Sequence, residues 1–93
     1  RIHRTCMKSQ TTQSFWTHYR ALPPEVRQRA RHAYRLWRTD PSHPSLFFKR
    51  VKESQPLYSV RIGRAHSALG LLKGDTITWF WIGAHDEYDR LLR

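Results

Sequence analysis

The segment "TITWFWIG", residues 76–83, is apolar at both its odd and its even positions. A strand with two apolar faces must be covered on both sides, so this pattern predicts an interior strand of a sheet. The turn signal "KGD" at 73–75 comes directly before it, and the strand-like "HSALGLLK" at 66–73 precedes that turn. We therefore expect strands at 66–73 and 76–83 to form a hairpin.

Two earlier segments show the period-two alternation of strands, at residues 45–51 ("SLFFKRV") and 57–63 ("LYSVRIG"). In the second segment, apolar side chains take one face and polar side chains take the other. The apolar face is formed by Tyr58, Val60 and Ile62, and the polar face by Ser59 and Arg61. Together with the hairpin, these segments predict a mainly antiparallel sheet of four strands.

Residues 12–22 have the spacing of an amphipathic helix. Its apolar stripe comprises Phe15, Tyr19 and Leu22, and Thr11 or Thr12 can cap its first turn. A second helix is expected to begin at Pro24 and to end near Arg38, because "TDPSHP" cannot continue it. The buried face of this second helix is expected to comprise Val26, Ala30, Ala33 and Trp37.

Residues 84–92 return to helical spacing after Gly83, which we expect to let the chain turn sharply into this last helix. The predicted class is α+β, with an N-terminal two-helix hairpin on one face of the sheet and a short C-terminal helix. The other face, which includes Arg61, is expected to be concave and basic. The whole chain, residues 1–93, is predicted to form a single domain.

The chain is strongly basic, and its charge is unevenly distributed. The formal net charge is +10; residues 1–74 hold 15 bases and 3 acids, whereas residues 75–93 hold 2 bases and 4 acids. A field of this size favours polyanions such as nucleic acid, or an acidic protein partner. The second helix places Arg27, Arg31, Arg35 and Arg38 on one arc. That arc fits an anionic partner and a solvated basic face equally well.

Several classes of protein are disfavoured. Cys6 is the only cysteine, which excludes an intrachain disulfide and fits a reducing compartment, so we predict a cytoplasmic protein. No run approaches the roughly 20 apolar residues of a membrane-spanning helix. No phosphate-binding glycine loop or other cofactor motif is found, so no cofactor is predicted. Met7 suits a natural start, with residues 1–6 as an extension or a disordered segment.

Residues able to transfer protons and to bind phosphate occur late in the chain and on two of the predicted strands. RNA can be cut by its own 2′-OH if a protein supplies proton transfer and positive charge at the phosphorane, without a metal. His85 and Tyr88 are three residues apart and share a helix face. Lys49 and Arg61 supply cations from neighbouring strands. These residues are therefore candidates for RNA cleavage.

The acids of "HDEYD", residues 85–89, are better explained by helix electrostatics than by metal binding. Asp86 and Glu87 lie in the first turn, where the helix dipole favours negative charge, and Asp86 can pair with Arg90. Asp89 is expected to be solvated. Because the carboxylates point to different helix faces, we predict no metal site.

Four stretches occur in an order that is similar to one known family. They are "ALPPEVRQRARHAYRLW", "DPSHPSLFFKRV", "LYSVRIG" and "WFWIGAHDEYDRLL". Over roughly residues 8–92 this ordered set resembles the RelE/ParE superfamily, the toxin halves of bacterial type II toxin–antitoxin systems. The resemblance implies a two-helix hairpin on a curved, mainly four-stranded antiparallel sheet with a short last helix. It adds a short leading strand at residues 7–11.

The resemblance also implies an activity and partners. Toxins of the RelE-like branch cleave mRNA in the ribosomal A site without a metal, and a small, largely acidic antitoxin wraps and represses them. We therefore expect an endoribonuclease that inhibits translation, whose partners are the ribosome, mRNA and a cognate antitoxin.

The resemblance assigns roles to residues of the basic first strand, the second strand and the last helix. The implied catalytic residues are His85, Tyr88, Arg61 and Lys49, and the implied RNA-binding residues are Arg50, Lys52 and Arg64. His85 matches a histidine at the start of the last helix in several relatives. Tyr88 resembles a functional tyrosine near the C-terminus of some members.

One position departs from the pattern of the relatives. They commonly open the third strand with Tyr-Arg or a similar pair, whose Arg binds the scissile phosphate, whereas this chain has His66 and Ser67 there. Loss of such a donor at a developing charge costs about 2.7–4 kcal/mol, or 10²–10³ in rate. Arg64, in the preceding turn, is the candidate to replace this arginine. If Arg64 does not replace it, we expect a weakened toxin.

Two alternatives remain open. A toxin of the ParE branch blocks DNA gyrase without cutting RNA, although the presence of His85 and Tyr88 speaks mildly against it. A non-toxic relative that only binds an antitoxin or nucleic acid is the second alternative, and Ser67 is the reason to consider it.

Overall fold

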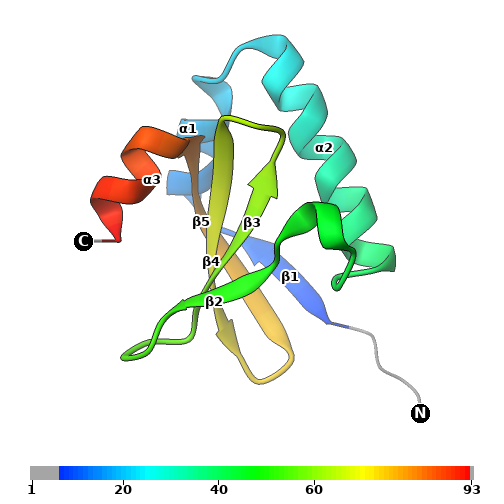
Figure 1. The fold of residues 1–93 in the computed structure, drawn as a ribbon, viewed down its shortest axis with the longest axis vertical. Coiled ribbons are helices and arrows are strands. Elements are labelled where there is room, and N and C mark those ends of the chain that lie inside the picture. Colours follow the sequence, from blue (N-terminus) through cyan, green and yellow to red (C-terminus); the bar gives the residue numbers. More distant parts are fainter. Residues whose placement is uncertain (1–6, 93) are drawn as a thin grey trace.

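The computed structural model describes residues 7–92, so the expectation for residues 1–6 lies outside the described residues. In chain order the elements are β1 (Lys8–Thr11), α1 (Gln13–Arg20), α2 (Pro24–Thr39), the 3-10 turn η1 (Pro44–Leu46), β2 (Lys49–Lys52), β3 (Leu57–Ile62), β4 (His66–Lys73), β5 (Thr76–Ala84) and α3 (His85–Leu91) (Figure 1). None of the helices in the described range is long and apolar enough to cross a membrane.

The sheet has five strands in the order β1-β5-β4-β3-β2. Strands β2 to β5 pair antiparallel in series, and β1 pairs parallel with β5. The predicted hairpin is confirmed: Lys73 lies opposite Thr76, and Gly74 takes a φ of 62° in the turn between them. The prediction of four strands is wrong by one, because β1 adds a short strand where the family resemblance implies a leading one.

The strand predicted at residues 45–51 begins later than expected. Pro44–Leu46 form η1 instead, and the side chain of His43 caps that turn by accepting a backbone N–H. Phe47 then takes the left-handed conformation, with a φ of 46°, so β2 starts only at Lys49. Capping and a proline at the start of the turn outweigh the strand propensity of the apolar residues.

The three predicted helices are confirmed to within two residues at each end. The Thr12 side chain accepts the backbone N–H of Phe15 and so caps α1, and Pro24 is the first residue of α2. Proline is favourable there because its fixed φ is helical and its missing N–H would have no partner. The predicted inner face of α2 is also confirmed, since Val26, Ala30, Ala33 and Trp37 are all buried.

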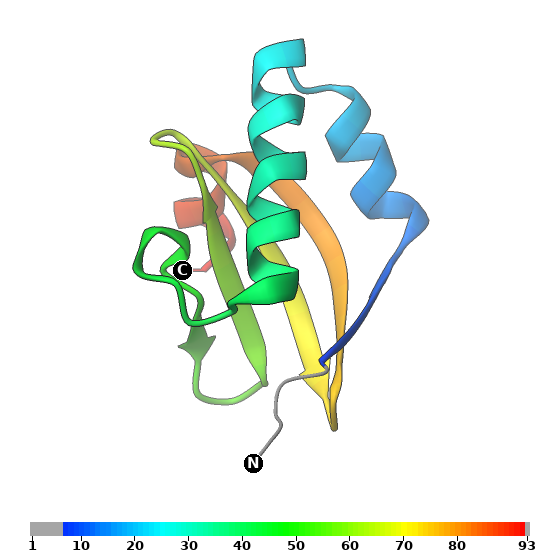
Figure 2. The same ribbon diagram turned by 90° about the vertical axis from the view of Figure 1, so that its right-hand side faces the viewer.

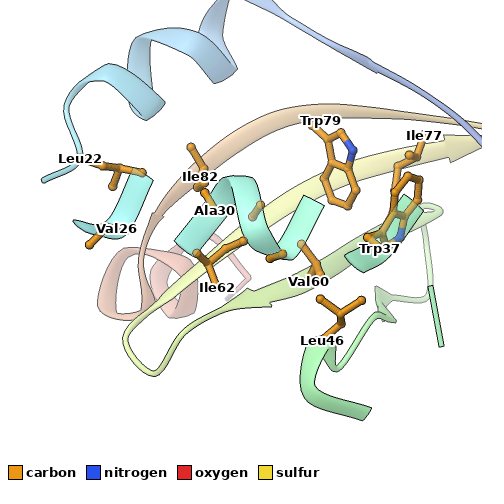
Figure 3. Packing of buried hydrophobic residues seen from close by; sticks show 12 residues of the cluster. Leu22, Val26, Ala30, Trp37, Leu46, Val60, Ile62, Ile77, Trp79 and Ile82 are labelled. Carbon is orange, nitrogen blue, oxygen red and sulfur yellow. The ribbon is translucent and has the colours of Figure 1, made fainter. Parts of the chain in front are cut away.

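The main core lies between α2 and the sheet (Figure 3). Trp37 is 1% exposed, and its ring makes edge-on contacts with Trp79 and Phe48, at 5.5 and 5.8 Å between centroids. Buried aromatic pairs of this kind contribute large apolar areas and about 0.5–1.5 kcal/mol each beyond area burial. Aromatic packing therefore fixes much of the position of α2 on the sheet.

A β-bulge in β5 explains why that segment is apolar on both faces. Leu69 is opposite Trp81 while Gly70 is opposite Trp79, so Phe80 is an extra residue between the two pairs. An extra residue reverses the alternation of side chains along a strand. Trp79 accordingly belongs to the core under α2, whereas Trp81 belongs to a second cluster on the opposite side.

Helix α3 covers part of the other face of the sheet, on the side away from α1 and α2 (Figure 2). We call it the α3 face; it includes Lys49 of β2, Leu57, Ser59 and Arg61 of β3, Ser67 and Leu69 of β4, and Trp81 of β5. Its buried cluster is formed by Leu57, Leu69, Trp81 and Tyr88. This face was expected to be basic; it does include Lys49 and Arg61, but α3 buries an apolar cluster on part of it.

Gly83 has a packing role rather than the turning role expected of it. The glycines with positive φ in residues 7–92 are Gly63 and Gly74, so Gly83 does not need the left-handed region. A Cβ at Gly83 would lie 2.6 Å from the ring of Trp81, a contact that real Cβ atoms do not make. The indole of Trp81 therefore requires a glycine at this position.

Candidate functional site

The α3 face brings together cations from two strands. Lys49 is directly opposite Ser59, so the two side chains share a face. Arg61 follows Ser59 by two residues and lies on that same face. Arg61 is in turn opposite Ser67, which is opposite Gly83. The structure thus places Lys49 and Arg61, two of the predicted site residues, on one surface.

Tyr88 attaches α3 to this face. It is 8% exposed, and its hydroxyl donates a hydrogen bond of 3.1 Å to Oγ of Ser59. Its ring stacks on His85, with 5.1 Å between centroids and 25° between planes. Because the hydroxyl is buried and already paired, Tyr88 positions α3 and the imidazole.

The two ring nitrogens of His85 lie in different surroundings. Nε2 is 3.6 Å from Oδ1 of Asp89, and 40% of the His85 side chain is exposed. Nδ1 is enclosed and has no hydrogen-bond partner within residues 7–92. Nε2 is then the nitrogen available for proton transfer, with a carboxylate beside it.

The turn between β3 and β4 meets the start of α3 at one end of the sheet. The backbone N–H of His85 donates a bond of 2.7 Å to the carbonyl of Ala65 in that turn. Arg64 is the preceding residue and is exposed. Arg61 lies in β3, the strand that leads into this turn, three residues before Arg64. We call this corner, formed by Arg61, Arg64 and His85, the basic corner.

Arg61 has a partner that sequence reasoning missed. Its guanidinium carbon lies 5.0 Å from the centroid of the Phe47 ring, in a cation–π contact. Phe47 is 57% exposed and is the left-handed residue that follows η1. The sequence did not indicate this contact, because its alternating pattern placed Phe47 in a strand.

Arg50 and Lys52, two of the predicted RNA-binding residues, lie away from the basic corner, on the edge strand β2. The Arg50 guanidinium donates to the backbone carbonyls of Lys52, Glu53 and Gln55, at 3.0 to 3.3 Å. Arg50 therefore stabilises the turn between β2 and β3. Lys52 is exposed at the end of β2.

The acids of α3 differ in part from their expected roles. Asp86 and Glu87 do lie in its first turn, as predicted. The expected pair between Asp86 and Arg90 is not formed among the described residues, and Asp89 contacts His85 instead of being only solvated. The spacing of four residues between His85 and Asp89 was the available signal for this contact.

The hydroxyl of Tyr88 gives a prediction about stability. Tyr88→Phe is expected to lower the free energy of unfolding by about 1 kcal/mol, because it removes the bond to Ser59 and leaves that hydroxyl enclosed. Urea denaturation of the single variants Tyr88→Phe and Ser59→Ala and of the double variant measures the coupling between the two hydroxyls. Unchanged stability of Tyr88→Phe, or additive effects of the two single changes in the double variant, would contradict this expectation.

Comparisons with known proteins place this fold in a family. The ParE-like toxin domain matches residues 24–90 of the chain. The search of curated proteins returns no match. Among solved structures, the RelB-RelE antitoxin-toxin complex from Methanococcus jannaschii is similar with a TM-score of 0.72 and 19% identity, covering 90% of this chain and 99% of that chain.

Two further solved structures have the same fold. The YoeB/ParE toxin from Agrobacterium tumefaciens has a TM-score of 0.67 and 18% identity, covering 85% of this chain and 99% of that chain. The RelBE2 toxin-antitoxin complex from Mycobacterium tuberculosis has a TM-score of 0.68 and 14% identity, covering 86% of this chain and 99% of that chain. On the family match over residues 24–90, the chain belongs to the ParE-like toxin domain family.

Proposed function

We propose that this chain is the toxin of a type II system and an endoribonuclease that cleaves mRNA on the ribosome without a metal. The observation that supports this best is the basic corner, where Arg61 of β3 and Arg64 of the turn from β3 to β4 lie at the same end of the sheet as His85 of α3. An imidazole that can transfer protons, at the same end of the sheet as two cations, suits cleavage of RNA by its own 2′-OH.

Each residue has a role in this proposal. Arg61 binds oxygens of the scissile phosphate, and Lys49 adds positive charge on the same face. The contact of Arg61 with Phe47 is worth about 0.5–1 kcal/mol at an exposed site, so the guanidinium can exchange the ring for a phosphate. The protonated ring of His85, whose charge Asp89 stabilises, donates the Nε2 proton to the leaving 5′ oxygen and becomes neutral, while the proton of the attacking 2′-OH passes to solvent water.

The partners follow from the same proposal. A net charge of +10 favours the ribosome and mRNA as targets and a small, acidic antitoxin as the repressor. The solved structures from M. jannaschii and M. tuberculosis are complexes of a toxin with its antitoxin, which supports an antitoxin for this chain as well. The site of action would be the cytoplasm, where translating ribosomes are found.

The test is induction of the chain in a bacterial host, with primer extension on abundant transcripts. We expect growth arrest, together with new 5′ ends inside translated regions that disappear when translation initiation is blocked. Intact transcripts during growth arrest would refute RNA cleavage. Growth that continues unchanged would instead favour a non-toxic relative that only binds an antitoxin or nucleic acid.

Inhibition of DNA gyrase is the second candidate. It is favoured by the ParE-like description of the family and by Ser67, which leaves β4 without the phosphate-binding arginine that the resemblance to nuclease toxins implies at this position. Plasmid supercoiling measured in the same induced cultures separates the two functions. Loss of negative supercoiling with intact mRNA would establish the gyrase alternative.

A further inference from the structure

A large groove lies on the helical side of the sheet, between α1 and α2. Its volume is about 590 Å³, and residues Ser9, Gln10 and Thr11 of β1 line one wall. Helix α1 lines it with Phe15, Trp16 and Tyr19, and α2 with Arg31, Tyr34 and Arg35. Figure 2 shows α1 (blue) beside α2 (cyan to green), with α3 (red) behind the sheet. The groove is therefore separate from the basic corner.

Two aromatic rings of this groove remain exposed to solvent. Trp16 is 41% exposed, and Tyr34 is 40% exposed. The Trp16 ring is supported edge-on by Phe15 and Tyr19, at 5.1 and 5.2 Å between centroids, and its Nε1 donates to Thr11. An ordered, exposed aromatic ring of this kind is a platform on which another planar group can stack.

Tyr34 is also held in place. Its hydroxyl lies 2.6 Å from Oγ of Ser9, and it accepts a bond of 3.1 Å from Arg38. Partial burial raises the pKa of the phenol, but the hydrogen bonds with Ser9 and Arg38 and the charge of Arg38 outweigh it, so the pKa of Tyr34 is lowered overall. The ring is thus fixed between β1 and α2.

The charge of the groove is entirely positive. Its lining includes Arg31 and Arg35 and no acid. Arg31 donates to the hydroxyl of Tyr19 at 2.7 Å, which holds its guanidinium across the groove. Arg27, a fourth member of the predicted arginine arc, donates instead to the carbonyl of Leu22. Arg27 therefore stabilises the connection between α1 and α2, whereas Arg31 and Arg35 line this groove.

We propose that the groove binds single-stranded RNA, with a base stacked on Trp16 and phosphates bound by Arg31 and Arg35. Proteins bind unpaired nucleotides by stacking bases on exposed aromatic rings and by holding the phosphates with nearby cations. The hydroxyl and amide groups of Ser9, Gln10 and Thr11 can hydrogen-bond the ribose 2′-OH. This binding does not depend on the chemistry proposed for the basic corner.

The test is fluorescence anisotropy of the purified chain with a labelled oligouridylate of about 12 nucleotides. Trp16→Ala is expected to weaken binding about 10-fold through lost stacking. Arg35→Gln, at an exposed position, is expected to weaken binding and to reduce the slope of log K against log salt by about 0.7. Arg90→Gln removes the same charge from α3 and is the matched control, with little effect expected.

Three results would overturn the assignment. Unchanged affinity in both Trp16→Ala and folded Arg35→Gln would remove the groove from RNA binding. Equal affinity for oligodeoxythymidylate of the same length would refute selectivity for RNA. Tighter binding of poly-L-glutamate, lost in the same variants, would make the occupant an acidic protein segment. His85→Ala, which removes the proposed proton donor but no phosphate-binding residue, should lose mRNA cleavage yet keep oligouridylate binding, which separates this proposal from the proposed function.

Discussion

Replacing His85 with alanine is expected to reduce mRNA cleavage by about 10²–10⁴-fold, the usual effect of removing a general acid or base. The imidazole is the group at the basic corner that can transfer a proton near neutral pH. Its orientation is fixed by stacking on Tyr88 and by Asp89 at 3.6 Å from Nε2. Primer extension at matched toxin levels measures the effect, and relief of growth arrest should accompany it.

His32→Ala is the matched control for this experiment. His32 is an exposed histidine on α2. It lines a pocket that Arg61 also lines, but it is not among the residues that contact the imidazole of His85, so its loss should leave cleavage unchanged. Thermal unfolding of both variants shows whether lost activity reflects lost structure. Full cleavage by a folded His85→Ala protein would remove the imidazole from the mechanism.

The elements with strong local signals could be predicted from the sequence. Helix α2 has a proline at its first position, a regular apolar face and two prolines after its end. The β4–β5 hairpin has a glycine in its turn and apolar strands on both sides. In these segments local propensity and tertiary packing favour the same structure, which is why pattern and fold agree.

Strand β1 and η1 lacked such signals. Four residues of mostly polar sequence, "KSQT", show no alternation, and β1 exists because β5 offers it an open edge. The start of β2 was misplaced because "LFF" has the composition of a strand, whereas the cap by His43 and the left-handed Phe47 depend on local backbone geometry. The family resemblance supplied β1 where periodicity could not.

The candidate site was predictable only where its residues are close in sequence. The shared helix face of His85 and Tyr88 follows from their spacing, and the structure has the two rings stacked. The bond between Tyr88 and Ser59 joins segments far apart in the chain, so no local pattern indicates it. The bulge at Phe80 places Trp81 on the α3 face. A strict alternation of faces along the strand does not predict that bulge.

Introducing the arginine of nuclease relatives through Ser67→Arg is expected to destabilise the fold rather than to raise activity. Ser67 is 4% exposed, and it stands between Arg61 and Gly83 in the paired strands. A long cationic side chain there would be enclosed under α3 and would face the like charge of Arg61. An uncompensated buried charge costs about 3–5 kcal/mol, so the free energy of unfolding should fall by about that amount.

Urea denaturation followed by tryptophan fluorescence measures this change, and Ser67→Ala, expected to cost about 1 kcal/mol or less, is the matched control. In the same variants, primer extension should show no gain in cleavage for Ser67→Arg, since the corner already has Arg61 and Arg64. A stable Ser67→Arg protein that cleaves mRNA faster would contradict this expectation. It would mean that α3 moves to accommodate the arginine side chain. It would also mean that the α3 face binds phosphate, and that it does so more weakly with Ser67 than with an arginine.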